Sequence, residues 1–145
     1  MAHLTLVYGD DTGDTHLTDI QLLPGGGAGG LAYRELPDVP VTTMTVTDML
    51  ERRPTRDLHP PPRRQLVVIL RGEIEIATTS GDRQRLGVGD CVLVDDLDSK
   101  GHTFEDVGDE PLLTVQVGIA SNWPVRGIAG RDASGAQPAS QTETG

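Results

Sequence analysis

The chain has 145 residues, of which 36% are hydrophobic and only 3% aromatic, with 18 glycines and 10 prolines. This length suits one domain with a single core, and the composition favours short β-strands packed through Val, Leu and Ile. The formal net charge of -10 would repel a phosphate backbone or an anionic lipid surface, so we expect neither nucleic acid nor membrane as a partner.

The first residues, MAHLTLVYGDDTGD, lack the basic start and apolar run of a signal peptide. No window reaches the roughly 18 apolar residues of a membrane helix. The single cysteine, Cys91, cannot form an intramolecular disulfide and is interpreted as a small core residue. We therefore expect a cytoplasmic protein.

Strands are predicted from the N-terminus onward. His3–Tyr8 can form a short strand, and the alternation of polar and apolar residues over Thr15–Leu23 predicts a half-buried one. The glycine-rich stretch Pro24–Gly30 is predicted to be a loop, because so many glycines lose too much backbone entropy in a regular element. It lacks the Lys and Ser/Thr of a phosphate-binding loop, so we expect no phosphate site there.

The β-branched stretch Val39–Leu50 predicts the next strand, with at most one helical turn near Thr47–Arg52. Further strands separated by Gly and Asp turns are expected within Leu66–Ile76, Arg85–Asp96, Gly101–Val107 and Leu112–Ala120. This rhythm is typical of a β-sandwich or barrel. Residues 127–145 are small and polar, and they are predicted to be a disordered tail.

The stretch LHPPPRRQLVVILRG carries the most informative pattern. In a strand, alternate residues share a face; the residues expected to point into the core are His59, Pro61, Arg63, Gln65, Val67 and Ile69. A buried amide without partners costs about 1–3 kcal/mol. Gln65 is therefore expected to bond a ligand or a polar neighbour, and His102 is the obvious neighbour.

Two stretches, "LHPPPRRQ…LRGEIEI" and "LGVGD…KGH", resemble the two-motif signature of the cupin superfamily over Pro54–Ile119. His59 matches the first histidine of its H-x-H and Gly72 matches the first-motif glycine, and Gly89 and His102 match the second motif. The departures in the first motif are Pro61 in place of the second histidine and Gln65 in place of the glutamate. The departures in the second motif are Asp95 in place of the proline, two extra residues in the loop, and Asp106 in place of the asparagine. The resemblance implies an all-β, double-stranded β-helix, a jelly-roll barrel. One domain would then span residues 1–126, with N-terminal strands within residues 3–47 extending its sheets.

The resemblance also implies a metal site, with His59, Gln65 and His102 as ligands and Asp95 or Asp96 as a replacement carboxylate. Such a set would suit one divalent transition ion, Fe, Ni, Mn, Zn or Cu. A neutral amide and a missing histidine weaken the set, so a site without metal is the alternative.

Acid/base chemistry is the second possibility for these residues. A carboxylate beside an imidazole orients it or raises its pKa, which makes His59, His102 and Asp95 or Asp96 candidate catalytic residues. The planar guanidinium of Arg63 suits an acidic or oxygen-rich substrate and joins the catalytic set. Gln65, Arg64 and Trp123 are candidate substrate-binding residues.

These residues lead to one expected function and two alternatives. We expect an enzyme that catalyses isomerisation, cyclisation, elimination or dehydration of a polar metabolite without redox change. The alternatives are a metal-dependent dioxygenase and a non-catalytic ligand-binding protein. Exposed edge strands give a physical reason for pairing between chains, so a homodimer is expected.

Overall fold

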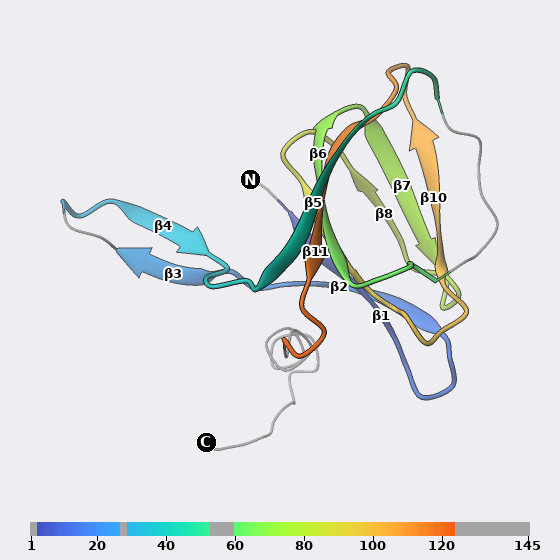
Figure 1. Ribbon diagram of the computed structural model, residues 1–145, viewed down its shortest axis with the longest axis horizontal. Coiled ribbons are helices and arrows are strands. Elements are labelled where there is room, and N and C mark those ends of the chain that lie inside the picture. Colours follow the sequence, from blue (N-terminus) through green and yellow to red (C-terminus); the bar gives the residue numbers. More distant parts are fainter. Residues whose placement is uncertain (1–2, 27–28, 53–59, 124–145) are drawn as a thin grey trace.

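The structure is a computed structural model that describes residues 3–26, 29–52 and 60–123 (Figure 1). These residues form 11 β-strands and no helix, which confirms the all-β prediction. The strands are β1 (Leu4–Gly9), β2 (Thr15–Asp19), β3 (Leu23–Gly26), β4 (Ala32–Glu35), β5 (Val41–Asp48), β6 (Gln65–Arg71), β7 (Glu73–Thr78), β8 (Arg83–Leu86), β9 (Cys91–Asp95), β10 (His102–Val107) and β11 (Leu113–Ile119). In these ranges no helix is long and apolar enough to cross a membrane.

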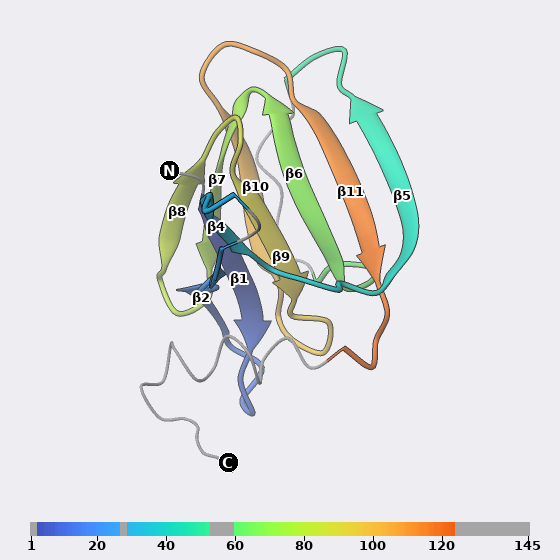
Figure 2. The same ribbon diagram turned by 90° about the vertical axis from the view of Figure 1, so that its left-hand side faces the viewer.

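The strands form two main sheets and a projecting hairpin. The larger sheet has the order β2-β1-β9-β6-β11-β5, and the smaller has the order β10-β7-β8. Figure 2 shows the larger sheet in front of the smaller one, and Figure 1 shows the β3–β4 hairpin extending away from both. Neighbouring strands are antiparallel except β1 and β9. Within the described ranges no backbone ladder joins β2 to β8 or β5 to β10, so the two sheets leave two open sides.

The core lies between the two main sheets. Val67 and Ile69 of β6 are buried, whereas Leu66 and Val68 on the alternate positions are half-buried and Leu70 is exposed, as the period of two predicts. The buried cluster consists of Val7, Val67, Ile69, Ile74, Ile76, Leu86, Val92, Val94 and Leu112. Each such side chain gains about 1.5–3 kcal/mol on leaving water, and this burial holds the sheets face to face.

The same inner face becomes polar toward the edge strand β5. Residues directly opposite each other in a ladder share a face. Ile69 pairs with Thr114, which pairs with Thr47, and Val67 pairs with Gln116. Hydroxyl and amide groups therefore replace methyl groups as the sheet runs from β6 to β5, at the open side that faces β10.

The opposite face of this sheet is apolar. Over β1 and β9 it is covered, in a second buried cluster of Leu6, Ile20, Leu93 and Ile119, and toward β5 it is open to solvent. The ladders align Met44 with Val117 and Leu66, and they align Val46 with Val115 and Val68. Met44 is 67% exposed and Val46 is 59% exposed. An uncharged stripe therefore crosses β5, β11 and β6 on the side seen in Figure 2.

One local prediction is wrong, and one helical turn that the sequence allowed is not formed. Leu23–Gly26, at the start of the predicted glycine loop, is strand β3 because its backbone pairs with β4. Gly25 suits this pairing, since a Cβ there would lie 2.1 Å from the Tyr33 ring across the ladder. No helical turn forms at Thr47–Arg52 in the described chain, where Thr47 belongs to β5. His59 and the predicted tail, residues 127–145, lie outside the described residues.

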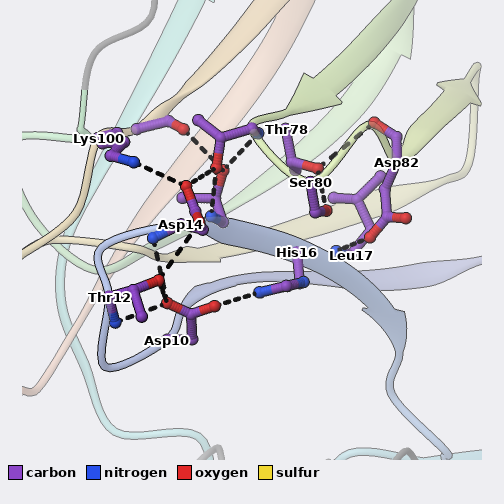
Figure 3. A network of polar contacts seen from close by, with 12 residues as sticks. Asp10, Thr12, Asp14, His16, Leu17, Thr78, Ser80, Asp82 and Lys100 are labelled. Carbon is purple, nitrogen blue, oxygen red and sulfur yellow. Dashed lines mark hydrogen bonds and ion pairs between the residues drawn. The ribbon is translucent and has the colours of Figure 1, made fainter.

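The β1–β2 turn is built around the carboxylate of Asp10 (Figure 3). Its Oδ1 accepts hydrogen bonds from the backbone N–H of Thr12, at 2.8 Å, and of Asp14, at 3.1 Å. Its Oδ2 lies 2.7 Å from Nε2 of His16. The bond with His16, followed by that with Thr12, lowers the pKa of Asp10.

Asp14 joins this turn to two other segments. Its Oδ1 accepts hydrogen bonds from Nζ of Lys100, at 2.9 Å, and from Oγ1 of Thr79, at 3.1 Å. These contacts, with Lys100 first, lower the pKa of Asp14, and Asp14 in turn raises the pKa of Lys100. The network therefore ties the β1–β2 hairpin to the β7–β8 turn and to the segment before β10.

The network predicts acid sensitivity. The folded-state pKa of Asp14 lies below its ordinary value of 3.8, so its stabilising contribution is complete above that value and is lost as the pH falls through the folded pKa. We expect Asp14→Asn to lower the free energy of unfolding at neutral pH and to converge with the original protein in acid. Denaturant titrations from about pH 7 to about pH 2.5 measure the difference.

Asp109→Asn, in the exposed β10–β11 turn, is the control and should track the original protein at neutral pH. A difference between Asp14→Asn and the original protein that stays constant into acid would contradict this role for Asp14.

Candidate functional site

A cavity of about 190 Å³ lies at the open side between β10 and β5. Its lining comes from both sheets and from the segments next to them. The lining residues are Thr47, Met49, Pro62, Gln65, Val67, Ile74, Phe104, Leu112, Thr114 and Gln116. The cavity thus combines an apolar wall with the hydroxyl and amide groups of β5, β6 and β11, a mixture suited to a small polar molecule.

Gln65 is the predicted site residue that lines this cavity. Three other polar residues of the lining bond one another. Oγ1 of Thr47 donates to Oε1 of Gln116 at 3.2 Å, and Nε2 of Gln116 donates to Oγ1 of Thr114 at 3.4 Å. Across the described ranges, no hydrogen bond is formed by the side-chain amide of Gln65. A ligand in the cavity can therefore use both its donor and its acceptor.

A buried carboxylate and imidazole lie next to the cavity wall. Nδ1 of His102, the first residue of β10, is 2.7 Å from Oδ2 of Asp96, which follows β9. Their side chains are 1% and 0% exposed. Oδ1 of Asp96 has no hydrogen-bond partner among the described residues. Val92 and Val94 face the core, so the alternation of β9 directs Asp96 inward and Asp95 outward.

Phe104 connects this pair to the cavity. The rings of His102 and Phe104 meet edge to face, with centroids 4.7 Å apart and an interplanar angle of 83°. Phe104 lines the cavity, whereas His102 is not among its lining residues. The Phe104 ring therefore separates the imidazole of His102 from a molecule bound in the cavity.

The His102–Asp96 arrangement suits proton transfer. A carboxylate bonded to one ring nitrogen fixes the orientation of the ring. Nε2 is then the nitrogen that can exchange a proton with a substrate. In a dry environment this interaction is stronger than in water. Leaving Asp96 Oδ1 unpaired costs about 1–3 kcal/mol, a cost that a functional site can retain.

Arg64, Asp95 and Trp123 come together elsewhere. Nε of Arg64 is 2.7 Å from Oδ1 of Asp95, and their side chains are 14% and 6% exposed. The same guanidinium donates to the backbone carbonyls of Trp123, at 2.5 Å, and of Ala120, at 3.3 Å. None of these residues lines the cavity. The ion pair holds the segment after β11 against the ends of β6 and β9.

The remaining predicted site residues are Arg63 and His59. Arg63 is exposed and does not line the cavity, and His59 lies outside the described residues. In the ranges that the structure describes, no three His, Cys, Asp or Glu side chains come together as metal ligands. The metal site stays a prediction, since His59 is one of its ligands.

Sequence reasoning missed several residues of the cavity, namely Thr47, Phe104, Thr114 and Gln116. A signal for two of them exists: Thr114 and Gln116 alternate with Val115 and Val117, so they share a face of β11. The other face of this strand is wholly apolar. Two polar residues together on one face of an otherwise apolar strand are therefore the signal that would have indicated a site.

The geometry predicts a structural role for Arg64. We expect Arg64→Met to destabilise the protein by about 3–5 kcal/mol, because it leaves the buried carboxylate of Asp95 without its guanidinium partner. Denaturant unfolding measures this loss.

Arg83→Met is the matched control, because Arg83 pairs with Glu75 at 2.7 Å but is 66% exposed. It should cost no more than about 1 kcal/mol. Equal effects of the two substitutions would show that the Arg64–Asp95 pair is not structural.

The sequence was compared with protein-family models and with curated proteins, and it matches neither a family model nor a curated protein.

Proposed function

We propose that the chain is a jelly-roll protein of the cupin type and a small-molecule enzyme that uses acid/base chemistry without redox change. Two face-to-face sheets of mainly antiparallel strands support the architecture. Two motif glycines, Gly72 and Gly89, lie at turns with φ of 88° and 91°, and such positive values favour glycine. The first turn joins β6 to β7, and the second joins β8 to β9.

The His102–Asp96 pair beside the cavity is the observation that carries the proposal. Both groups are chemically competent and nearly closed from water, and the ring of His102 contacts Phe104 in the cavity wall. A purely structural core would more simply place an apolar pair there, since burying two ionisable groups is costly.

In the proposed mechanism, Gln65 and the Thr and Gln side chains of the cavity bind a polar substrate through its carbonyl or hydroxyl groups. Asp96 holds Nδ1 of His102, and Nε2 removes a proton from a substrate carbon or returns it to a neighbouring atom. Movement of the Phe104 ring opens the path between His102 and the substrate. Products of such transfers are isomers, cyclised forms or dehydrated forms of the substrate.

Two other functions compete with this proposal. A metal-dependent dioxygenase would need His59 to complete a ligand set with His102 and Gln65, and metal analysis of the purified protein tests it. A non-catalytic ligand-binding protein would use the same cavity, and turnover separates it from the enzyme.

Proton transfer is measured through deuterium uptake. In D₂O, NMR follows exchange of carbon-bound hydrogen in a panel of 2-keto and 3-keto acids, sugars and hydroxy acids. We expect catalysed exchange in at least one class, and a loss of about a hundredfold or more in His102→Gln. Binding to the cavity should persist in that variant.

His16→Gln is the matched control, because His16 and Asp10 form a pair of the same length, 2.7 Å, that is 30% and 35% exposed. It should leave exchange unchanged. Equal exchange in His102→Gln and the original protein, or activity that depends on a bound metal, would contradict metal-free acid/base catalysis.

We also propose that the chain forms a homodimer through the apolar stripe of Met44, Val46, Val115, Val117 and Val68. A chain with a net charge of -10 repels a second copy over most of its surface, whereas this stripe carries no charge. The edge strand β5 forms one end of this stripe, and unpaired strand edges favour association.

Light scattering tests this interface. We expect the mass of a dimer for the original protein and a shift toward monomer for Met44→Lys, because a buried lysine lacks a partner in the stripe. Val88→Lys, at a 69% exposed position in the β8–β9 turn, should stay dimeric. A monomeric original protein would rule out the dimer.

A further inference from the structure

A second cavity, of about 370 Å³, lies on the other open side of the molecule, between the edge strands β2 and β8. Its lining residues are Thr5, Leu17, Thr18, Asp19, Asp82, Arg83 and Gln84. It shares no residue with the cavity near His102. Its volume is in the range of small-molecule sites.

The two strand edges are clamped together at one end of this cavity. The backbone N–H of Leu17 donates to Oδ2 of Asp82 at 3.0 Å (Figure 3), and the N–H of Ser80 donates to the carbonyl of Thr15 at 3.3 Å. Beyond this clamp no ladder joins β2 to β8 within the described ranges. The cavity is therefore a built feature of two held strands and not a gap between mobile loops.

The electrostatic character of the cavity is negative. Asp19 and Asp82 supply carboxylates, and within the described chain Oδ1 of Asp82 makes no hydrogen bond. The basic residue in the lining, Arg83, directs its guanidinium to Glu75 at 2.7 Å, so it does not neutralise them. Such a site repels anions and attracts cations.

Thr5 adds an independent sign of ligand binding. Its side chain lines the cavity, the residue is 2% exposed, and Oγ1 has no hydrogen-bond partner among the described residues. A buried hydroxyl is normally bonded. An ammonium N–H could donate to this oxygen and to the carboxylates of Asp82 and Asp19.

We propose that the cavity between β2 and β8 binds a small organic cation through a primary ammonium group. The ammonium donates to Asp82, Asp19 and Thr5, and the remainder of the molecule contacts Leu17 and the amide of Gln84. A metal ion is a poorer fit, because the described residues hold no cluster of three His, Cys, Asp or Glu ligands. The inference does not depend on the proposed function.

Matched amines and alcohols test the charge requirement. The probes are putrescine against 1,4-butanediol and glucosamine against glucose, titrated into ¹⁵N-labelled protein. We expect at least one amine to shift, saturably, the amide signals of residues 17–19 and 82–84, and we expect its alcohol partner to shift them far less. Added salt should weaken the binding.

Substitutions test the residues. Asp82→Asn keeps an acceptor for the Leu17 N–H but removes the charge, so it should weaken amine binding about tenfold. Thr5→Val has the same shape without the hydroxyl and should weaken binding about threefold while the fold is kept. Asp109→Asn is the charge-matched control and should bind like the original protein.

The amide spectrum of each variant reports whether it is folded, and Asp19→Asn replaces Asp82→Asn if that variant is not. The proposal is overturned if no amine gives a saturable shift at these residues, if alcohols bind as well as amines, or if Asp109→Asn weakens binding as much as Asp82→Asn and Asp19→Asn do.

Discussion

The packing of apolar side chains between the two main sheets is the constraint on which the rest of the molecule depends. Strands β6, β7 and β9 contribute Val67, Ile76, Val92 and their neighbours to it. Toward β5 and toward β2 the edges of the larger sheet are not joined to the smaller one in the described chain. Polar side chains line both openings, and each opening contains a cavity.

The two buried acid pairs show how one strand serves two purposes. Asp95 and Asp96 are adjacent at the end of β9, and strand alternation sends them to opposite faces of the sheet. Asp95 bonds Arg64 and stabilises the segment after β11, whereas Asp96 bonds His102 inside the core. The inner pair lies beside the cavity near β5 and β10, whose lining contains neither Arg64 nor Asp95, and for that reason we propose chemistry for His102 and structure for Arg64.

Much of this arrangement follows from sequence periodicity, and the exceptions have physical causes. The alternation of β6 predicts the inward direction of Gln65 and Val67. The same rule applied to β9 would have predicted that Asp95 and Asp96 lie on opposite faces of the sheet. The chain bends at Pro62 and Arg63 before β6 begins, so the alternation does not extend back to Arg63, which is exposed. Strand β3 was missed because its stability comes from pairing with β4, which local glycine content does not report. The cavity between β2 and β8 joins residues far apart in the chain, and no local pattern marks it.

The central claim is that Asp96 holds the imidazole of His102 in an environment closed to water. NMR of the imidazole N–H protons in ¹⁵N-histidine-labelled protein tests this claim most directly. The account predicts a slowly exchanging Nδ1 proton on His102, lost in Asp96→Ala, beside a rapidly exchanging ring on the exposed His3. A His102 ring proton that exchanges with water as rapidly as that of His3 would contradict it.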